Sequence, residues 1–467
     1  MPSYPLTAEA QRENAAALAA ALGLDLGEAA KLLDLTVVIT VNPADTVAAA
    51  LALDIAELLS RTVRGVSIDT TQAIPAAELV IGDVRPRTEA RKLFLSIGHG
   101  NATLSRTTMP PKECQPIHGL LRTIATCYAC AAMLDCALDS ELPFGLPDPL
   151  VLPFDALGVD PVDLGKPIDI GHVYLAGAGA IGNGLLWAAR HLHLQGRLEI
   201  VDDDHVDSGN LNRQVWFGTE DIDLKKVDRL VLKAQPFFPK LALIPRSQRL
   251  QDLSEKSAAP WLRRLIVAVD SRRARRQLQN EFPGEVFDAS TTDIREVVVH
   301  YHRQPTTQAC LSCIYEPDEE ELSREQHVAN HLGVSVDAVR SERIGVAEAI
   351  VIGKRFPALA NADLTGTAYD TLFKRLCGEG LLRTVAGRGV AAPFAFVSVL
   401  AGALLALELV RRLGSGNSDR TFNYWRVSAW HPPLSRRRVL RPRQPGCQYC
   451  SSETLQYVNS QLWRAQA

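Results

Sequence analysis

The chain has 467 residues, and its 50 Lys and Arg against 53 Asp and Glu give a formal net charge of −3. Hydrophobic residues at 46% and charged residues at 22% are typical of a globular protein, so a disordered or fibrous chain is excluded and the length predicts two or three domains. The near-neutral charge gives no strong field, so neither nucleic acid nor an anionic membrane is an expected partner.

The first 160 residues are predicted to form an α/β domain. Their pattern favours a strand, a helix and a second strand, at 35–41, 45–63 and 63–69. Asn42 and Pro43 stand at the first turn, where a nucleotide-binding loop would carry glycines. The start of the chain has no basic segment followed by an apolar run, so no signal peptide is expected, and the expected compartment is the cytoplasm.

Three long segments complete this outline. An alanine-rich helix over 119–137 contains Cys127 and Cys130, which we interpret as small buried residues. A proline-rich stretch over 141–167 marks a domain junction. An apolar run over 390–410 contains a proline, a glycine and a glutamate, which favours a buried core helix over a membrane span.

These segments predict that the chain consists of an N-terminal domain, a second α/β domain and a C-terminal tail. A polar, acidic stretch interrupts the second domain and is predicted to be an insertion. The predicted boundaries are 1–160, 161–450 with the insertion at 316–388, and 451–467.

A glycine motif opens the second domain. Gly177, Gly179 and Gly182 follow an apolar strand and precede a helix, a context that favours nucleotide binding over a simple packing turn. Asp202 ends the next strand, where an acidic residue holds a ribose, and Asp204 follows it closely. These residues alone are also compatible with a nicotinamide or flavin enzyme.

The residues after Asp202 favour a different reaction. A dehydrogenase has no need of this set, whereas a site that holds a triphosphate needs cations against its developing charge; the residues are Asn210, Arg213, Gln214 and Lys226. Asp270 ends a further apolar strand and is a candidate for binding Mg²⁺ or for positioning an attacking carboxylate.

This ordered set, GAGAIG followed by DxDxVxxxNLNRQ, a lysine and two CxxC pairs, resembles the ThiF/MoeB/E1 family of ubiquitin-like-protein activating enzymes over 173–315 and 390–450. The resemblance implies a Rossmann-like adenylation fold with a parallel-rich sheet. It implies that the three glycines cradle the phosphates of ATP, that Asp202 holds the ribose beside Asp204, and that Asp270 serves Mg²⁺. Asn210, Arg213, Gln214 and Lys226 would contact the phosphates and the adenylate transition state. Gly209 and Asp223 depart from the family pattern.

Two CxxC pairs predict a structural zinc site. Four thiolates are a tetrahedral Zn²⁺ ligand set, and the chain only has to return to bring the pairs together. The ligands would be Cys310, Cys313, Cys447 and Cys450, and a degenerate site without metal is the alternative.

Cys377 lies in the insertion. Family members that pass the activated protein onward place a thiolate cysteine in this region, so the resemblance implies that Cys377 forms a thioester with a ubiquitin-like protein for transfer to an E2-like partner. Lys374 and Arg375 would lower its pKa. A small buried cysteine is the alternative.

The family also works as dimers or as fused pairs with one inactive half. The N-terminal region, a β-α-β unit without the glycine motif, fits such an inactive half, with an unrelated docking domain as the alternative, and either a homodimer or a fused pseudo-dimer would result. Arg12 is a candidate for the arginine that a partner half supplies. The layout resembles bacterial E1-like proteins of antiphage ubiquitin-like conjugation operons.

Three other functions stay open on the sequence. A sulfur-carrier adenylyltransferase would need no enzyme thioester. A nicotinamide-binding Rossmann enzyme would leave Arg213, Lys226 and the cysteine pairs unused. A degenerate, non-enzymatic E1 scaffold would have no reason to keep the ATP-site residues.

Overall fold

A computed structural model describes residues 6–70, 74–107, 112–139, 142–257, 260–317, 319–341, 343–359, 363–369, 372–373, 376, 393–414, 421–434 and 437–463. The chain divides into two compact units, one made of Met1–Ile314 with Ala391–Ala467 and the other of Tyr315–Val390. The first unit contains both β-sheets of the protein's described part. The three-part division at 160 and 450 stays a prediction.

The N-terminal half of the first unit has a six-stranded sheet in the order β2-β1-β3-β4-β5-β6. The first four strands are parallel, and β5 and β6 run antiparallel to their neighbours. The predicted strand-helix-strand at the start is confirmed, with α3 (Thr46–Leu59) between β1 and β2. The strands are β1 (Thr36–Val41), β2 (Gly65–Ile68), β3 (Ala77–Ile81), β4 (Arg91–Ile97), β5 (Asn101–Ser105) and β6 (Leu150–Pro153).

The second sheet has eight strands in the order β14-β13-β12-β11-β10-β7-β8-β9. The five strands from β11 to β9 are parallel, which confirms the expected α/β fold with a parallel-rich sheet. The strands are β7 (Ile168–Ala176), β8 (Leu194–Val201), β9 (Leu241–Arg246), β10 (Arg264–Val267), β11 (Glu285–Thr292), β12 (Glu296–Arg303), β13 (Tyr424–Ser428) and β14 (Arg438–Val439).

The two sheets share one connectivity. Strands β1 to β6 take the same relative places as β7, β8, β10, β11, β12 and β13, with the same parallel and antiparallel pairings. In each sheet a helix follows the first strand, α3 in one and α6 (Ala180–Ala189) in the other. A long buried helix precedes the last matched strand, α4 (Gly119–Ala137) in one and α14 (Ala395–Leu409) in the other.

The halves differ at the first helix. Asp45 caps α3: its Oδ1 accepts hydrogen bonds from the backbone N–H groups of Val47 at 3.1 Å and Ala48 at 2.9 Å. Its Oδ2 accepts a third from the N–H of Cys114 at 2.9 Å. A carboxylate therefore occupies the positive end of α3 in the N-terminal half.

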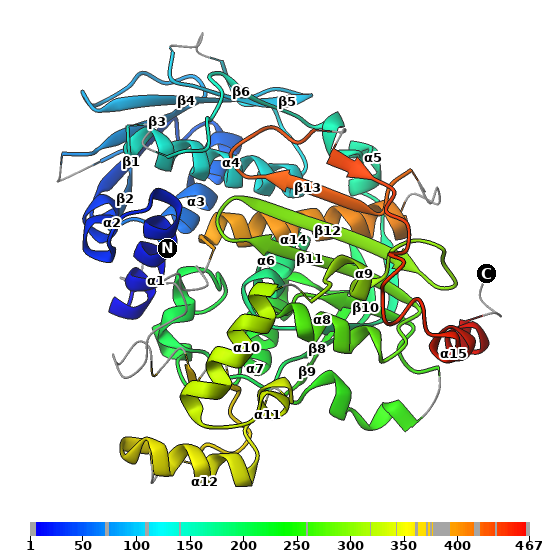
Figure 1. The fold of residues 1–467 in the computed structure, drawn as a ribbon. Coiled ribbons are helices and arrows are strands. Elements are labelled where there is room, and N and C mark those ends of the chain that lie inside the picture. Colours follow the sequence, from blue (N-terminus) through cyan, green and yellow to red (C-terminus); the bar gives the residue numbers. More distant parts are fainter. Residues whose placement is uncertain are drawn as a thin grey trace. The chain divides into compact units, whose positions relative to one another are not determined.

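Helices pair the two halves within the first unit (Figure 1). Helix α4 packs on β3, β4 and β5, α14 packs on β11 and β12, and the two helices contact each other. Every residue of α14 is buried, so the expected core helix is confirmed. Helix α4 is the helix of the described residues that is long and apolar enough to cross a membrane, and 94% of that window is buried inside the protein. Cys127 and Cys130 lie buried on it, as expected.

The remaining helices of the first unit lie around these sheets. They are α1 (Ala8–Leu22), α2 (Leu26–Leu33), α5 (Pro161–Leu164), α7 (Lys226–Ala234), α8 (Arg272–Gln279), α9 (Leu311–Ile314) and α15 (Glu453–Trp463).

The second unit is helical in its described residues. Helices α10 (Glu319–Leu332), α11 (Val336–Arg340) and α12 (Val346–Arg355) share a small core that includes Leu332, Ile352 and Leu376. The predicted insertion 316–388 falls in this unit's span. Cys377, with Lys374 and Arg375, lies outside the described residues.

Candidate nucleotide site and cysteine cluster

The glycine motif forms the turn between β7 and α6. Gly177 has φ +104°, and a Cβ there would lie 2.7 Å from the carbonyl oxygen of Ala268. A Cβ on Gly182 would lie 2.3 Å from the carbonyl oxygen of Gly177, so both positions require glycine. Gly179, by contrast, faces open space, and no side chain of the described residues caps the N-terminus of α6. The start of α6 is therefore an accessible anion-binding position.

Carboxylates and a buried lysine lie at the ends of neighbouring elements. Asp202 Oδ2 accepts a hydrogen bond from the N–H of Ala178 at 2.7 Å, which joins the end of β8 to the glycine turn. Lys226 begins α7 and donates from Nζ to Asp204 Oδ2 at 3.0 Å. Burial raises the pKa of Asp202 against the charge of Lys226. Burial also lowers the pKa of Lys226, but the charges of Asp202 and Asp204 outweigh it and the pKa stands above its ordinary value.

Arg213 follows a short 3-10 turn, η2 (Ser208–Asn212). Its Nη1 donates to the carbonyl oxygen of Gly209 at 3.1 Å and to Asn212 Oδ1 at 2.7 Å. Burial lowers the pKa of Arg213, and the charges of Glu13 and Asp270 oppose that shift. Asp270 is exposed in the turn before α8, and its charge also raises the pKa of Lys226. The charge of Asp270 therefore acts on both Arg213 and Lys226.

Two of the predicted phosphate-contacting residues have side chains that are bonded within the loop or buried. Asn210 Oδ1 accepts a hydrogen bond from the N–H of Asp207 at 3.3 Å, within its own turn. Gln214 is buried, and its Oε1 has no hydrogen-bond partner among the described residues. The roles of both toward a phosphate stay predictions.

The departures from the family pattern have a local explanation. Asp223 has φ +65°, a left-handed conformation that glycine adopts without penalty and that aspartate adopts more readily than most residues. Gly209 is buried, and a Cβ there would lie 3.2 Å from Asp207 Oδ1.

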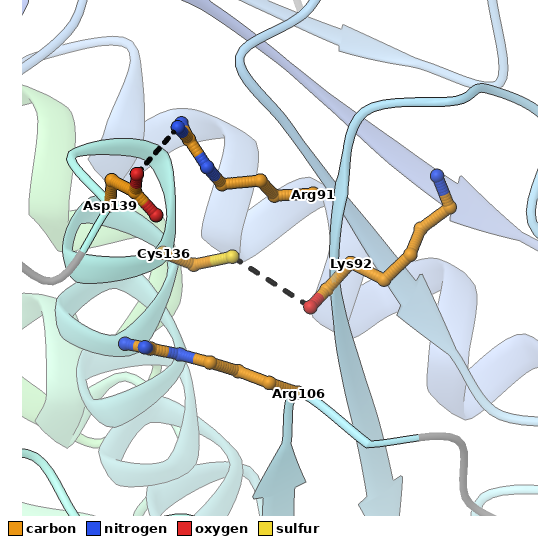
Figure 2. A pocket seen from close by; sticks show the side chains of 5 residues that line it. All are labelled: Arg91, Lys92, Arg106, Cys136 and Asp139. Carbon is orange, nitrogen blue, oxygen red and sulfur yellow. Dashed lines mark hydrogen bonds and ion pairs between the residues drawn. The ribbon is translucent and has the colours of Figure 1, made fainter.

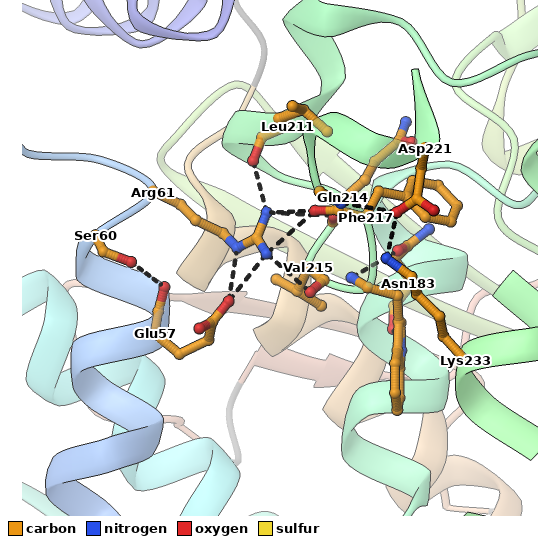
Figure 3. Close-up of polar contacts among 12 residues, drawn as sticks. Glu57, Ser60, Arg61, Asn183, Leu211, Gln214, Val215, Phe217, Asp221 and Lys233 are labelled. Carbon is orange, nitrogen blue, oxygen red and sulfur yellow. Dashed lines mark hydrogen bonds and ion pairs between the residues drawn. The ribbon is translucent and has the colours of Figure 1, made fainter. Parts of the chain in front are cut away.

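Three residues that the sequence analysis did not single out hold the site loops in place. Asn183 on α6 donates to the carbonyl oxygens of Ala178 at 2.9 Å and Gly179 at 3.0 Å. Arg61 reaches the loop around Arg213 from the N-terminal half (Figure 3), and so does Asn14, which accepts a hydrogen bond from Asn212. A buried asparagine in an apolar helix was a readable signal, whereas Arg61 and Asn14 have no local signature.

The N-terminal helix reaches η2 within the same chain. Thr7 Oγ1 donates to the carbonyl oxygen of Ser208 at 2.8 Å, and Glu13 Oε2 lies 3.8 Å from Arg213 Nη1. Arg12 is exposed on the same helix, and its role toward a nucleotide stays a prediction.

The four predicted zinc ligands form one cluster. The sulfurs of Cys310 and Cys313 are 3.7 Å apart, and Cys450 Sγ lies 3.6 Å from Cys313 Sγ and 3.5 Å from Cys310 Sγ. Cys310 Sγ to Cys447 Sγ is 3.8 Å. A tetrahedral ion with Zn–S bonds of about 2.3 Å places its sulfurs about 3.8 Å apart, whereas a disulfide needs about 2 Å. The donor set and its spacing therefore fit a zinc ion.

A separate pocket in the N-terminal half has a volume of about 250 Å³ and is lined by Arg91, Lys92, Arg106, Cys136 and Asp139 (Figure 2). Its cations already have partners: Arg91 pairs with Asp139 at 2.9 Å, and Arg106 pairs with Asp135. Lys92 Nζ donates to the carbonyl oxygen of Thr88 at 2.6 Å. This pocket therefore has no spare charge for an anion.

Comparison with known proteins gives two family matches and several relatives. Residues 6–160 match the E1 N-terminal domain, and residues 162–449 match the ThiF family. The uncharacterized protein y4jF of Sinorhizobium fredii is 29% identical over 364 residues, 71% of this chain and 67% of that protein. The sulfur carrier protein ThiS adenylyltransferase of Escherichia coli is 27% identical over 201 residues, 42% of this chain and 71% of that protein.

A human protein, ubiquitin-like modifier-activating enzyme 7, is 35% identical over 88 residues, which are 18% of this chain and 9% of that protein. The ThiF match spans more than half of the chain, so the nicotinamide-enzyme and non-enzymatic-scaffold alternatives fall away. The chain belongs to the ThiF family of E1-like, ATP-dependent adenylyltransferases.

Proposed function

We propose that the chain is an E1-like activating enzyme that uses Mg·ATP to adenylate the C-terminal carboxylate of a ubiquitin-like protein. The observation that carries the proposal is the glycine turn at the accessible start of α6, whose Ala178 N–H donates to Asp202, with Lys226 paired to the nearby Asp204. The match to the E1 N-terminal domain favours a ubiquitin-like protein as the substrate.

In the proposed reaction a carboxylate oxygen of the carrier attacks the α-phosphorus of ATP. A new P–O bond forms, the bond to pyrophosphate breaks, and an acyl adenylate results. Arg213 and Lys226 offset the negative charge that develops on the phosphate oxygens. The remaining contacts to ATP would come from Gly177, Gly179, Gly182, Asp202, Asn210 and Gln214.

Mg²⁺ would be held by the carboxylates that follow strand β8. The carboxylate oxygens of Asp202, Asp203 and Asp204 lie within 4.8 Å of one another, and oxygen ligands of this kind are those that Mg²⁺ prefers. Asp270 is exposed, and its charge acts on both Arg213 and Lys226. When bound, the ion supplies positive charge against the phosphates.

The second proposed step is transfer to Cys377. Its thiolate attacks the acyl carbonyl, the C–S bond forms and AMP leaves, which splits one difficult transfer into two easier ones. The thioester then passes to an E2-like partner. The similarity to the human ubiquitin-like modifier-activating enzyme supports a ubiquitin-like protein as the group that is transferred.

We also propose that the N-terminal half is an inactive adenylation half, so that the chain is a fused pair. The shared connectivity of the two sheets supports this, and so does Asp45, which occupies the helix start where the other half is open. The cysteine cluster would hold a structural zinc ion.

A sulfur carrier is the second candidate substrate. The 27% identity to the ThiS adenylyltransferase over 71% of that protein favours it. Such an enzyme would form the carrier adenylate without an obligatory thioester on Cys377.

The test is an intact-mass assay of the full chain with Mg·ATP and, as the probe, the ubiquitin-like protein encoded nearest its gene, as in a bacterial antiphage operon. Wild type, Cys377→Ala and Cys114→Ala would be compared without reducing agent. A thiol-sensitive adduct of one carrier mass in wild type and Cys114→Ala, absent in Cys377→Ala, would support the proposal. Carrier adenylate formed equally by all three would favour the sulfur-carrier candidate.

A further inference from the structure

One guanidinium of the N-terminal half holds the loop that carries Arg213 and Gln214 (Figure 3). Arg61 follows α3, and its Nη1 donates to the carbonyl oxygen of Leu211 at 2.7 Å. Its Nη2 donates to the carbonyl oxygen of Val215 at 3.0 Å. Weaker contacts from Nη1 reach the carbonyl oxygens of Gln214 at 3.4 Å and Phe217 at 3.3 Å. Four carbonyls of one loop thus face a single cation.

Glu57 fixes the direction of that guanidinium. Its Oε1 accepts hydrogen bonds from Arg61 Nε at 3.1 Å and Nη2 at 2.9 Å, one helical turn away. The Arg61 side chain is 13% exposed. Arginine suits this position because its planar fork presents several donors at once, which lysine cannot do.

A second path joins the same loop to the N-terminal half. Asn14 Nδ2 donates to the carbonyl oxygen of Arg61 at 2.7 Å, and Asn14 Oδ1 accepts from Asn212 Nδ2 at 2.9 Å. Asn212 Oδ1 in turn accepts from Arg213 Nη1 at 2.7 Å. The direction of the Arg213 side chain is therefore linked by hydrogen bonds to residues of the other half.

We propose that Arg61 is a positioning residue of the adenylation site, an inference that rests on the proposed function. It does not touch the nucleotide; it sets the backbone from which Arg213 and Gln214 project. Without it, four carbonyl dipoles face one another with no donor between them, and the loop relaxes away from the geometry that binds phosphate. The N-terminal half would then be required for activity although it performs no chemistry.

Asp54 supplies a matched control. It lies on α3 and accepts hydrogen bonds from Arg122 Nε at 3.1 Å and, across the boundary between the halves, from Arg190 Nη2 at 3.0 Å. Neither of these two contacts involves the 211–217 loop. Asp54→Asn therefore weakens the contact between the halves without touching the carbonyls that Arg61 holds.

The experiment measures binding of Mg·ATP to the full chain by calorimetry, alongside thermal unfolding. We expect Arg61→Ala to weaken ATP binding at least about tenfold, because small misplacements of binding groups have large effects, and Asp54→Asn to leave the affinity within about twofold of wild type. Arg61→Lys, which keeps the charge and loses the fork, should give an intermediate affinity. Hydrogen exchange should quicken around 209–217 in Arg61→Ala alone.

The possible results distinguish a failure of the Arg61 inference from a failure of the proposed function. Wild-type affinity in Arg61→Ala would overturn the inference and leave the proposed function standing. An equal loss in Asp54→Asn would also overturn it, because any loosening of the halves would then suffice. A wild-type chain that does not bind ATP would overturn the proposed function itself. Should Arg61→Ala fail to fold, Arg61→Lys is judged against Asp54→Asn by the same criterion.

Discussion

A single amide side chain, Asn183, joins the glycine turn to the loop after Gln214. It is fully buried; its Nδ2 donates to two carbonyls of the turn, and its Oδ1 accepts from the N–H of Trp216 at 3.1 Å. Trp216 Nε1 returns a hydrogen bond to the carbonyl oxygen of Asn183 at 3.1 Å. Donor and acceptor must both be present, so this position specifies an amide and not merely a polar residue.

Asn183→Asp tests that statement with almost no change of shape. The variant places a carboxylate oxygen against two carbonyl oxygens, so we expect the free energy of unfolding to fall by about 2–4 kcal/mol and ATP binding to weaken. Urea unfolding measures the first effect. Asn280→Asp, at an exposed asparagine, is the control and should change stability by less than about 0.5 kcal/mol. Equal stabilities for the two variants would contradict the hydrogen bonds described for Asn183.

Helices α6 and α14 cross at a pair of glycines. A Cβ on Gly402 would lie 2.1 Å from the carbonyl carbon of Gly184, and a Cβ on Gly184 would lie 2.6 Å from the carbonyl oxygen of Ser398. These backbones approach so closely that no side chain fits between them. The helix that begins the nucleotide site is therefore seated directly on the core helix of the second sheet.

Gly402→Ala should push the two helices apart. We expect the free energy of unfolding to fall by about 1–3 kcal/mol, because overpacking a rigid core strains both helices. The control is Gly165→Ala, where the new Cβ would meet no atom closer than 3.8 Å. Thermal unfolding compares the two, and a Gly402→Ala variant as stable as the control would show that the crossing can adjust.

Strand β3 carries a buried carboxylate that makes the N-terminal half sensitive to acid. Burial acts to raise the pKa of Glu78, but hydrogen bonds from Thr40, Arg87 and Thr88 outweigh it and hold the pKa below its ordinary value of 4.5. A pKa lowered on folding gives stability that is fully present above about pH 4.5 and is lost as the pH falls through the folded-state value.

Wild type should therefore lose more stability than Glu78→Gln between neutral pH and pH 3. At neutral pH the variant should be the less stable protein, because an amide nitrogen would face hydrogen-bond donors. Denaturant unfolding across this pH range checks both statements. Parallel stability curves for the two proteins would exclude a role for Glu78 in the acid transition.

At the scale of the whole molecule, the cysteine cluster ties the end of the chain to its middle. It joins α9 and the residue just before it to the residues before α15, and Trp463 Nε1 on α15 donates to the carbonyl oxygen of Phe282 at 3.1 Å. We expect about one zinc ion per purified chain and, after chelation, rapid proteolysis confined to residues beyond 440.

Metal analysis and limited proteolysis measure these two outcomes. Cys450→Ser should lose the metal and show the same cleavage without a chelator, whereas Cys127→Ala, on α4, should keep the metal. A chelated chain that resists protease as well as the untreated one would show that packing around Trp463 alone holds α15.

Local patterns predicted much of the fold and the elements on which the candidate site lies. The glycine turn, the strand ends at Asp202 and the cysteine pairs are recognisable because each depends on residues close together in the sequence. Arg61 could not be found this way, since it binds backbone carbonyls 150 residues or more away, and a carbonyl has no sequence signature. The likeness of the two halves was expected only through the family resemblance, because strand order has no local pattern and the glycine motif is missing from one half.

The carboxylate of Asp45 has a consequence for stoichiometry. It is an anion attached to the chain, held at the start of α3 by three backbone N–H groups, and a phosphate arriving there would have to displace a ligand that never diffuses away. Although the protein contains two sheets of one connectivity, a calorimetric titration with ATP should saturate near one nucleotide per chain. In the N-terminal half, the Asp45 carboxylate therefore blocks the helix start that would otherwise bind a phosphate.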